Sequence, residues 1–365
     1  MGAKHIFVIG AEFPIWMKLL GENKFNVAWK KIPNVFLITF IIILFSPLAV
    51  IEKIFSWNRL KRVKLKHPPI FILGHWRQGT TFLHELFNAN PEFEVMTLVE
   101  SVFPNHFLYS SSIVKWFFSL FLPETRPQDD LKIYADLPSE HDFAIANISS
   151  TSPYSGAYFP DNQDFYIKYV TMEDMSDKKI RQVKRSYKLV IEKLTLRKKY
   201  KQLVLKSPVD TARVELLLEL FPDAKFVHIA RNPYEVFYST RRMYEKLVPV
   251  FQLQNTYPDI DEFILYIYEG MYQRFFNDIS KIPEGNFVEI RYEQFIKSPS
   301  ETMSKVYDKL SLPGFETAQP FIQSYLEKHK DYTPSVYTFL PEELKLIYSR
   351  WHEIFKMMNY EDSVK

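Results

Sequence analysis

The longest uninterrupted apolar stretch lies near the start of the chain. Residues Val35 to Ile51, VFLITFIIILFSPLAVI, carry no charge, and charged residues flank them on both sides. At about 1.5 Å per residue, a helix over this run spans roughly 25 Å, slightly less than a ~30 Å hydrocarbon core. Pro47 would kink it, which favours a re-entrant or interfacial anchor, and a buried core helix stays open as an alternative. The pattern predicts a membrane-associating helix over residues 35–51.

Basic side chains stand on both sides of this run. The flank before it carries Lys18, Lys24, Lys30 and Lys31, and the flank after it carries Lys53, Arg59, Lys61, Arg62, Lys64 and Lys66. Positive charge marks the cytoplasmic side of a membrane segment. The small excess after the run predicts that the main part of the chain lies on the cytoplasmic side.

From Pro68 onward, short apolar runs alternate with segments of helical periodicity. The expected strands are 70–73, 203–205, 225–230 and 287–290, and the expected helices are 81–88, 211–221 and 233–247. Such alternation is typical of a parallel sheet covered by helices on both faces. Residues 104–138 are rich in aromatic side chains and irregular in pattern, which indicates an insertion or lid. The fold class is therefore α/β, with an additional N-terminal hydrophobic helix.

Composition narrows the class of protein. Of 365 residues, 47% are apolar and 24% charged, which is a globular balance, and the net charge of +3 argues against nucleic acid as a partner. The chain has no cysteine, which excludes disulfides, thiolate metal sites and a cysteine nucleophile. The pattern contains no cluster with metal-ligand spacing, so no metal is expected.

The residues Gly74-His75-Trp76-Arg77-Gln78-Gly79-Thr80-Thr81 join an expected strand to an expected helix. At such a junction, backbone N–H groups and the positive end of the helix dipole point toward one place, which suits a phosphate or sulfate. Arg77 adds a permanent charge, and the hydroxyls of Thr80 and Thr81 can cap the helix or bond anion oxygens. The loop is a candidate anion site, with a simple capped helix start as the alternative.

A phosphate-binding loop of the Walker type is the first rival interpretation. Gly74 and Gly79 stand five positions apart, as G-x-x-x-x-G-K-[ST] requires, but Thr80 occupies the lysine position. The residue that reaches the terminal phosphates of a nucleoside triphosphate is therefore missing. A membrane-associated kinase or NTPase becomes the lesser alternative.

Four segments together resemble the broad bacterial and eukaryotic sulfotransferase family. They are PPIFILGHWRQGTTFLHELF (68–87), LVLKSP (203–208), FVHIARNPYEVFYS (226–239) and EIRYEQFIKSP (289–299). The resemblance implies a P-loop-like three-layer fold and an enzyme whose donor is 3'-phosphoadenosine 5'-phosphosulfate. It divides the chain into an N-terminal segment, 1–66, and a sulfotransferase domain, 67–365, with an acceptor insertion at about 100–170.

The resemblance also assigns roles to residues. It implies that the loop from Arg77 through Gln78, Gly79, Thr80 and Thr81 binds the phosphosulfate, and that Arg231 and Ser239 hold the 3'-phosphate. An arginine at the end of a strand and a serine eight positions later, on a helix, can converge on one phosphate. Tyr292 and Phe82 are candidates for the adenine, with ordinary core aromatics as the alternative. The family's C-terminal basic loop has no clear match, and Lys328, Lys330 and Tyr332 are possible substitutes.

Sulfuryl transfer requires cations around the sulfuryl oxygens and a base for the acceptor proton. Arg77 and Lys206 are the candidate cations, although Lys206 could instead be a surface ammonium at a strand end. The histidine that soluble relatives carry two positions after this lysine is absent, because Lys206 is followed by Ser207 and Pro208.

The base is therefore sought in the segment 137–160, which resembles the family's acidic motif. Glu140 is favoured over its neighbour His141, because helical geometry would place Glu140 on the same face as Ala144. A carboxylate near apolar walls or an unperturbed histidine can both titrate near neutrality. His75 is a third candidate that could equally pack beneath the loop. The acceptor stays open among a lipid-like alcohol, a carbohydrate and a small phenol, and a membrane surface is an expected partner.

Overall fold

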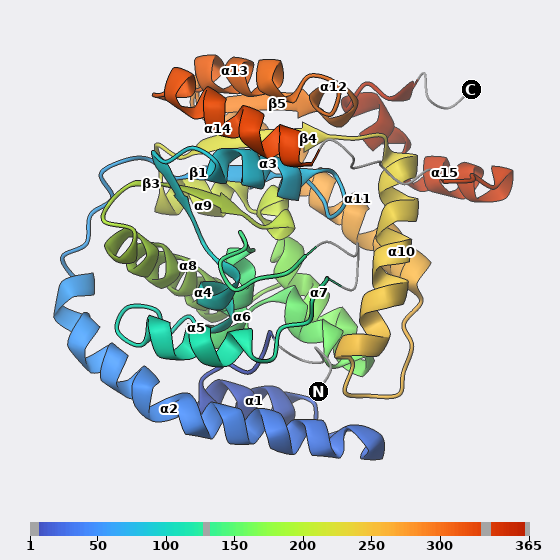
Figure 1. The fold of residues 1–365 in the computed structure, drawn as a ribbon. Coiled ribbons are helices and arrows are strands. Elements are labelled where there is room, and N and C mark those ends of the chain that lie inside the picture. The colour runs from blue at the N-terminus through green and yellow to red at the C-terminus, as the bar shows by residue number, and fades with distance from the viewer. Residues whose placement is uncertain (1–6, 127–131, 330–336, 362–365) are drawn as a thin grey trace. The chain divides into compact units, whose positions relative to one another are not determined.

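The computed structural model describes residues 7–126, 132–329 and 337–361 (Figure 1). The chain forms two compact units. Unit 1 comprises Met1–His67, Val95–Lys201 and Met243–Pro258, and unit 2 comprises Pro68–Glu94, Gln202–Arg242 and Asp259–Lys365. The hydrophobic N-terminal segment thus shares a unit with the residues expected to form the acceptor insertion, while the functional division at residue 67 stays a prediction.

Unit 2 is built on a five-stranded sheet of order β2-β3-β1-β4-β5. The strands are β1 (Ile70–Leu73), β2 (Phe93–Val95), β3 (Gln202–Lys206), β4 (Lys225–Ala230) and β5 (Phe287–Arg291). β1 lies between β3 and β4 in parallel register, and β4 pairs with β5 in the same way. β1 and β3 are buried on both faces, which explains their continuous apolar runs.

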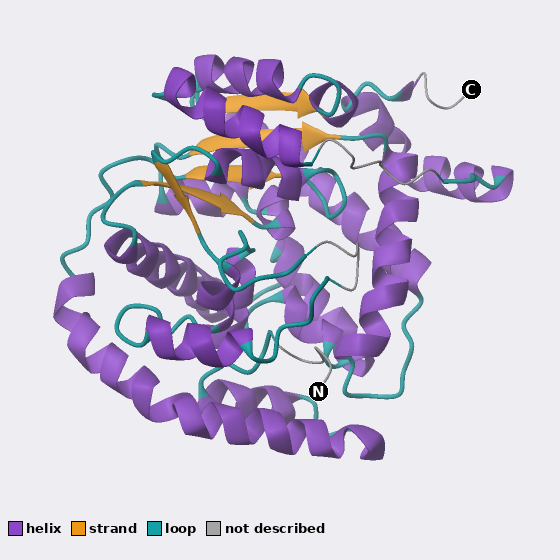
Figure 2. Cartoon of the chain, in the orientation of Figure 1, coloured by secondary structure: helices purple, strands orange, loops and turns teal. Residues whose placement is uncertain are grey.

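Helices of unit 2 cover both faces of this sheet (Figure 2). The helices of unit 2 are α3 (Thr80–Asn88), α9 (Val214–Leu220), α11 (Ile260–Asp278), α12 (Tyr292–Phe295), α13 (Pro299–Lys309), α14 (Phe315–Lys328) and α15 (Pro341–Met357), with 3-10 turns η4 (Pro208–Ala212) and η5 (Ile279–Lys281); α15 packs against α11. α10 (Pro233–Phe251) begins in unit 2 and continues into unit 1. The α/β class is confirmed, and the four expected strands are present. The helix expected over 211–221 is instead the turn η4 followed by α9, and strand β2 was not anticipated.

Unit 1 is helical. Its helices are α1 (Phe13–Glu22), α2 (Ile32–Leu60), α4 (Leu98–Val102), α5 (Ser111–Ser119), α6 (His141–Ser149), α7 (Gln163–Thr171) and α8 (Asp177–Arg197), with 3-10 turns η1 (Trp29–Lys31), η2 (Pro153–Ala157) and η3 (Pro160–Asn162). The segment 104–138, expected to be irregular, contains α5. Its sequence SSIVKWFFS places Val114 and Phe118 four positions apart, and both are buried.

The hydrophobic N-terminal helix is confirmed and is longer than expected. α2 has 29 residues and continues through Pro47 without interruption. The stretch Trp29–Leu60, with a mean hydropathy of 2.5 in its most apolar window, is long and apolar enough to cross a membrane. Length and composition alone are weak support for a spanning role, because core helices of soluble proteins pass the same test.

Candidate active site

The loop between β1 and α3 is held in a backbone conformation that requires glycine at its end. Gly79 has a φ of 92° and forms the N-cap of α3. A Cβ atom at this position would lie 2.6 Å from the ring of Tyr292. At the other end of the loop, the amide of Gly74 donates to the hydroxyl of Thr211 at 2.7 Å. Positive φ and close packing together explain why the loop carries glycine at position 79.

Gln78 supports the loop from below. Its side-chain oxygen accepts from the backbone amide of His75 at 2.6 Å and from the hydroxyl of Tyr272 at 2.7 Å. Its side-chain nitrogen donates to Tyr268 at 3.4 Å. Gln78 is fully buried. The Gln78 side chain therefore contacts the protein interior. Direct binding of Gln78 to the cofactor stays a prediction.

The contacts of Gln78 continue to the neighbouring strands through Tyr272. The Tyr272 hydroxyl lies 3.1 Å from Nε2 of His228 on β4, and Nδ1 of His228 lies 2.8 Å from a carboxylate oxygen of Glu289 on β5. Burial raises the pKa of Tyr272, which keeps it a neutral hydroxyl at physiological pH. The loop is thus connected by hydrogen bonds to two strands on one side of β1.

His75 packs beneath the loop. Its ring meets Tyr268 edge-on at 5.0 Å, and Nδ1 lies 3.0 Å from the carbonyl of Trp76. Burial lowers the pKa of His75 to about 3. An enclosed, neutral imidazole stabilises the loop by packing. This position fits the alternative in which His75 packs beneath the loop.

Arg77 and Ser239 come from two distant motifs and meet directly. The guanidinium Nε of Arg77 donates to the hydroxyl of Ser239 on α10 at 3.1 Å. Arg77 adopts a left-handed backbone conformation with a φ of 69°. This conformation costs free energy in a non-glycine residue, so the surrounding contacts must maintain it.

Arg231, immediately after β4, joins the same cluster. Its Nη1 donates to the carbonyl of Arg77 at 2.7 Å, and its guanidinium lies 4.1 Å from the ring centre of Tyr292. It also forms an ion pair with Glu235 at 2.7 Å, one helical turn further along α10. The structure therefore brings Arg77, Arg231, Ser239 and Tyr292 together at the carboxyl ends of β1 and β4, where ligands bind in open α/β sheets.

The remaining loop residues occupy the first turn of α3. Thr80 is buried, Thr81 and Phe82 are half-buried, and the Phe82 ring packs 4.9 Å from that of Phe295. The first N–H groups of a helix have no partner within the helix and carry the positive end of its dipole. With two arginines beside them, these groups form an arrangement suited to an anion.

Lys206 lies where the order of strands predicted it. It is the last residue of β3 and stands opposite Ile72 of β1, two residues before Gly74. Its side chain is 4% exposed, so the surface-ammonium alternative does not describe its position. A buried ammonium near the end of β1 adds positive charge on the other side of the loop from β4.

Glu140 and His141 stand at the start of α6 in unit 1. Glu140 is the N-cap with extended backbone angles, so the argument that placed it on a helix face with Ala144 does not apply, because the helix begins one residue later. Its carboxylate accepts a hydrogen bond from the Tyr154 hydroxyl. Glu140 is half-buried, whereas His141 is 1% exposed and meets the Tyr187 ring at 5.4 Å.

Sequence reasoning missed the partners that hold these residues. Glu235 follows Arg231 at the i,i+4 spacing of a helical ion pair, so its signal was present in the sequence. Tyr268 and Tyr272 also share a helix face, but no local pattern connects that face to a loop almost 200 residues earlier. Lys328 ends α14, and Lys330 and Tyr332 lie outside the described residues.

Comparison with known proteins identifies the family of this chain. A model of the sulfotransferase family matches residues 68–317. The chain is 30% identical over 357 residues to omega-hydroxy-beta-dihydromenaquinone-9 sulfotransferase Stf3 of Mycobacterium bovis, covering 97% of this chain and 91% of that protein. The counterpart from Mycobacterium tuberculosis matches equally. These matches extend through the N-terminal segment that precedes the family model.

Solved structures show the same fold. Sulfotransferase STF9 from Mycobacterium avium superposes with a TM-score of 0.66 at 16% identity, covering 84% of this chain and 81% of that one. Sulfotransferase STF1 from Mycobacterium tuberculosis gives 0.66 at 17% identity, covering 94% of both chains. The chain is an enzyme and belongs to the sulfotransferase family.

Proposed function

We propose that this enzyme transfers the sulfuryl group of 3'-phosphoadenosine 5'-phosphosulfate to a hydroxyl of a lipid-like acceptor. The observation that carries the donor assignment is the contact of Arg77 with Ser239, completed by the bond from Arg231 to the Arg77 carbonyl. Residues from two motifs that lie more than 150 positions apart converge beside the start of α3. The two cationic side chains at this place, Arg77 and Arg231, suit a donor with two separate anionic groups, the phosphosulfate and the 3'-phosphate.

The donor would be held at both ends. Arg77, Gly79, Thr80 and Thr81 bind the phosphosulfate in this proposal, and Gln78 positions their loop from below. Arg231 and Ser239 bind the 3'-phosphate. The ion pair with Glu235 holds the Arg231 guanidinium in place before the donor arrives.

The adenine would lie beside Tyr292 or Phe82. Tyr292 supports this role because its ring already packs against a guanidinium and against Gly79, a flat environment that also suits a base. Phe82 supports it less, since its ring packs against Phe295.

The reaction is an in-line displacement at sulfur. The acceptor oxygen forms a bond to sulfur while the bond from sulfur to the bridging phosphate oxygen breaks, and adenosine 3',5'-bisphosphate leaves with the electron pair. Arg77 and Lys206 stabilise the charge on the sulfuryl and departing oxygens. The acceptor proton passes to a base.

Glu140 remains the proposed base, with His141 as the alternative. Glu140 is half-buried and bonded to Tyr154, so its carboxylate is both accessible and oriented. Burial raises the pKa of Tyr244, and the charge of the nearby Glu140 adds to this rise. His141 is enclosed, which makes direct contact with an acceptor harder for it.

The name of the curated relative supports a lipid-like acceptor. Stf3 is named for sulfation of omega-hydroxy-beta-dihydromenaquinone-9. A hydroxyl-bearing lipid is therefore preferred here over a carbohydrate or a small phenol, and the apolar helix α2 is consistent with a membrane-associated enzyme. The charge of the flanks supports a cytoplasmic position for the catalytic part. Family membership disfavours the kinase alternative.

Calorimetry on the purified enzyme tests the donor assignment. We expect tight binding of adenosine 3',5'-bisphosphate and weak binding of ATP. Arg231→Ala should weaken the bisphosphate roughly 10- to 100-fold, because a hydrogen bond to a charged group contributes about 1.5–3 kcal/mol, and should leave adenosine 5'-phosphosulfate nearly unaffected. Arg242→Ala, at an exposed arginine on α10, is the matched control.

Two results would contradict the proposal. Equal affinity for ATP and the bisphosphate would remove the basis for this donor. Equal losses for the bisphosphate and adenosine 5'-phosphosulfate in Arg231→Ala would refute the 3'-phosphate assignment, provided that thermal unfolding shows the variant to be folded.

A further inference from the structure

One face of α2 is apolar and exposed along most of its length. Its residues are spaced three, four or seven positions apart, as expected for one side of a helix. Six of them are more than half exposed: Phe36, Phe40, Ile43, Val50, Ile54 and Trp57. From Phe36 to Trp57 this face extends over roughly 32 Å. Large exposed apolar patches on a folded chain mark a surface that contacts another apolar phase.

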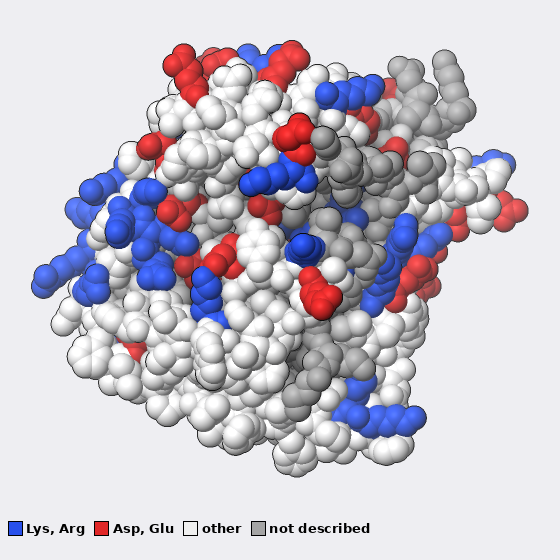
Figure 3. Space-filling model, viewed as in Figure 1, with Lys and Arg blue, Asp and Glu red and all other residues white. Residues whose placement is uncertain are grey.

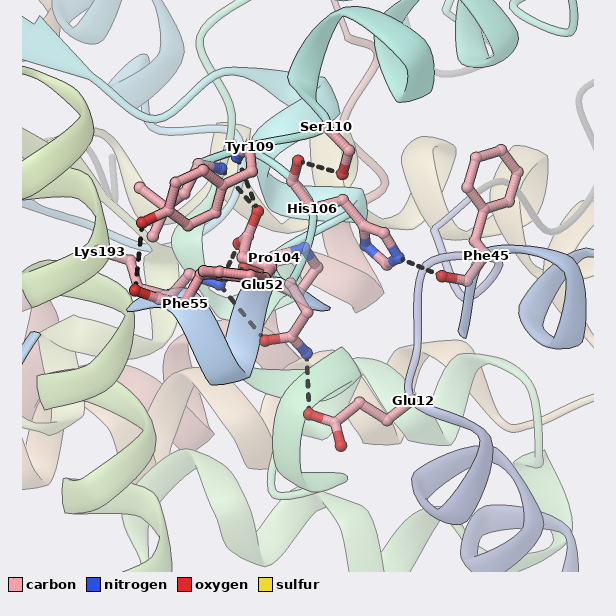
Figure 4. Close-up of polar contacts among 11 residues, drawn as sticks. Glu12, Phe45, Glu52, Phe55, Pro104, His106, Tyr109, Ser110 and Lys193 are labelled. Carbon is pink, nitrogen blue, oxygen red and sulfur yellow. Dashed lines mark hydrogen bonds and ion pairs between the residues drawn. The ribbon is translucent and has the colours of Figure 1, made fainter. Parts of the chain in front are cut away.

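The opposite face of α2 is fixed to the rest of unit 1. Ile38, Ile41, Ile42, Phe45 and Ala49 are buried on it. Near its end, Glu52 forms an ion pair with Lys193 of α8 at 2.7 Å, and both side chains are almost completely enclosed. Figure 4 shows this pair beside the loop that leads to α5.

Further hydrogen bonds hold α2 at the same place. The Glu52 carboxylate accepts from the backbone amides of Leu108 and Tyr109 at 2.8 and 3.1 Å. His106 contacts the carbonyl of Phe45 through Nε2 at 3.1 Å, as Figure 4 also shows. This contact adds a second connection between α2 and the segment that precedes α5. Detaching α2 would separate the Glu52 carboxylate from the Lys193 ammonium, which is a costly change for an enclosed ion pair.

These contacts exclude a simple spanning arrangement. α8 packs against α2 and carries eight Lys or Arg residues among its 21, DKKIRQVKRSYKLVIEKLTLR. A bilayer that enclosed the whole length of α2 would also have to accommodate α8. Charged side chains at that depth are strongly unfavourable.

α5 extends the apolar face of α2. Ile113, Trp116 and Leu120 are more than half exposed. Phe117 of α5 packs edge-on against Phe45 of α2 at 4.7 Å, and the Tyr109 hydroxyl donates to the carbonyl of Phe55. Tryptophan is enriched at the interface between lipid and water, where its ring contacts both phases.

A basic segment follows the apolar face directly. Its exposed cationic residues are Arg59, Lys61, Arg62, Lys64 and Lys66, joined by Lys199 and Lys201 after α8. Lys61 lies 4.4 Å from the Trp57 ring, and Lys66 lies 5.2 Å from that of Tyr200. Figure 3 shows basic side chains gathered at the left, beyond the end of α2, and a largely uncharged surface over α1, α2 and α5.

We propose that unit 1 docks on one leaflet of an anionic membrane, with α2 lying in the plane of the interface. The exposed faces of α2 and α5 enter the acyl region, and the basic segment binds the lipid headgroups. A second copy of the chain is a poorer occupant, because its own basic segment would repel this one. The proposal concerns how the enzyme meets the membrane and is independent of which donor it uses.

Vesicle flotation with the full-length enzyme tests the proposal. We expect binding to vesicles of phosphatidylcholine with phosphatidylglycerol, weaker binding to phosphatidylcholine alone, and a loss of the difference at high salt. The variant Phe40→Glu with Ile54→Glu should lose affinity about tenfold or more. Phe321→Glu with Leu346→Glu changes two exposed apolar residues of unit 2 and should bind as the unaltered enzyme does.

Labelling distinguishes lying in the interface from spanning. The chain has no cysteine, so Lys30→Cys and Lys64→Cys each introduce a single thiol, before and after α2. In sealed vesicles from the expressing cells, a membrane-impermeant maleimide should reach both from the same side. Labelling of the two positions from opposite sides would overturn the in-plane arrangement.

Other outcomes would overturn the docking surface itself. Flotation that is equal for the Phe40 and Ile54 variant and the unaltered enzyme would refute it, as would no binding to either vesicle. A dimer in solution that the variant converts to a monomer, without vesicle binding, would assign the surface to self-association. Bisphosphate affinity of each variant, measured without lipid, shows separately whether the donor site is intact.

Discussion

The two units bury polar groups in different ways around their functional regions. Beneath the Gly74 loop of unit 2, the enclosed groups are the neutral side chains of Gln78, Tyr272 and His75. Beneath α2 in unit 1, they are the charged pair of Glu52 and Lys193. Both clusters hold a surface segment in place, but only the second relies on two ions whose separation would be costly.

The difference between neutral buried groups in unit 2 and a buried ion pair in unit 1 has a physical reason. The part of this network next to the loop is neutral, and the carboxylate at its far end, Glu289, lies on β5, so the positive charge of Arg77 and the helix start remains available to a ligand. A buried ion pair is tolerated under α2 because no ligand is expected there, and it fixes which face of an apolar helix turns inward. Hydrophobicity alone would not choose between these faces.

The largest expected effect separates Glu140 from His141 in unit 1. Glu140→Gln should lower turnover about 10²- to 10⁴-fold at saturating donor, because general base catalysis contributes this much. His141→Asn should lower it far less. The acceptor for this assay is the lipid that a screen of a lipid extract with labelled donor identifies.

Binding of adenosine 3',5'-bisphosphate serves as the control, and neither variant should change it. A turnover that falls in His141→Asn and persists in Glu140→Gln would reverse the assignment. Equal, small effects in both variants would mean that the base lies outside the segment 137–160.

The two units also differ in how much of their structure could be predicted from the sequence. β1 and β4 appear at their expected bounds because each is a buried run ending in a motif, and Arg77, Arg231 and Ser239 converge because parallel strands end at one edge. Glu52 is different. It stands directly after the uncharged run and looks like a solvated flank, and its burial depends on Lys193, which lies 141 positions later. Long-range pairing of this kind has no local signal.

The same limit applies to the start of α6. The acidic motif led to Glu140 and His141, but the helix begins after Glu140, and a one-residue shift of a helix boundary changes which side chain faces which neighbour. The contact with Tyr154, which lies 14 residues later in η2, corrects what helical periodicity suggested.

The next effect is on stability and concerns the charged pair of unit 1. Glu52→Ala should reduce the free energy of unfolding by about 3–5 kcal/mol, because it leaves the buried Lys193 ammonium without its carboxylate. Chemical denaturation measures this loss. A double variant with Lys193→Met should recover part of it, since both ions are then absent.

Glu301→Ala provides the matched control, because Glu301 forms an exposed i,i+4 ion pair with Lys305. Its removal should leave the free energy of unfolding unchanged within error. If Glu52→Ala were equally silent, the pair would not fix α2, and the distinction between the two units would fail.

The last effect is a pH dependence of stability to which one histidine in each unit contributes. Burial lowers the pKa of His75 in unit 2 to about 3 and that of His106 in unit 1 to about 4. The unfolded chain takes up these protons near pH 6.5, while the folded chain stays neutral until the lower value. Stability is therefore independent of these groups above about pH 6.5 and falls as the pH drops below it, by at most about 1.4 kcal/mol per pH unit for each histidine.

His75→Asn and His106→Asn should each flatten the decline of the unfolding free energy between pH 6.5 and 4, and denaturation at a series of pH values measures this slope. Asparagine can still donate to the carbonyl that each ring nitrogen contacts, of Trp76 or of Phe45. At pH 8 both histidines are neutral in the folded and unfolded chain, so a difference there reports lost packing and is subtracted. A slope unchanged in His75→Asn would mean that this ring already takes up its proton in the folded state, and a neutral network could then not be what supports the loop.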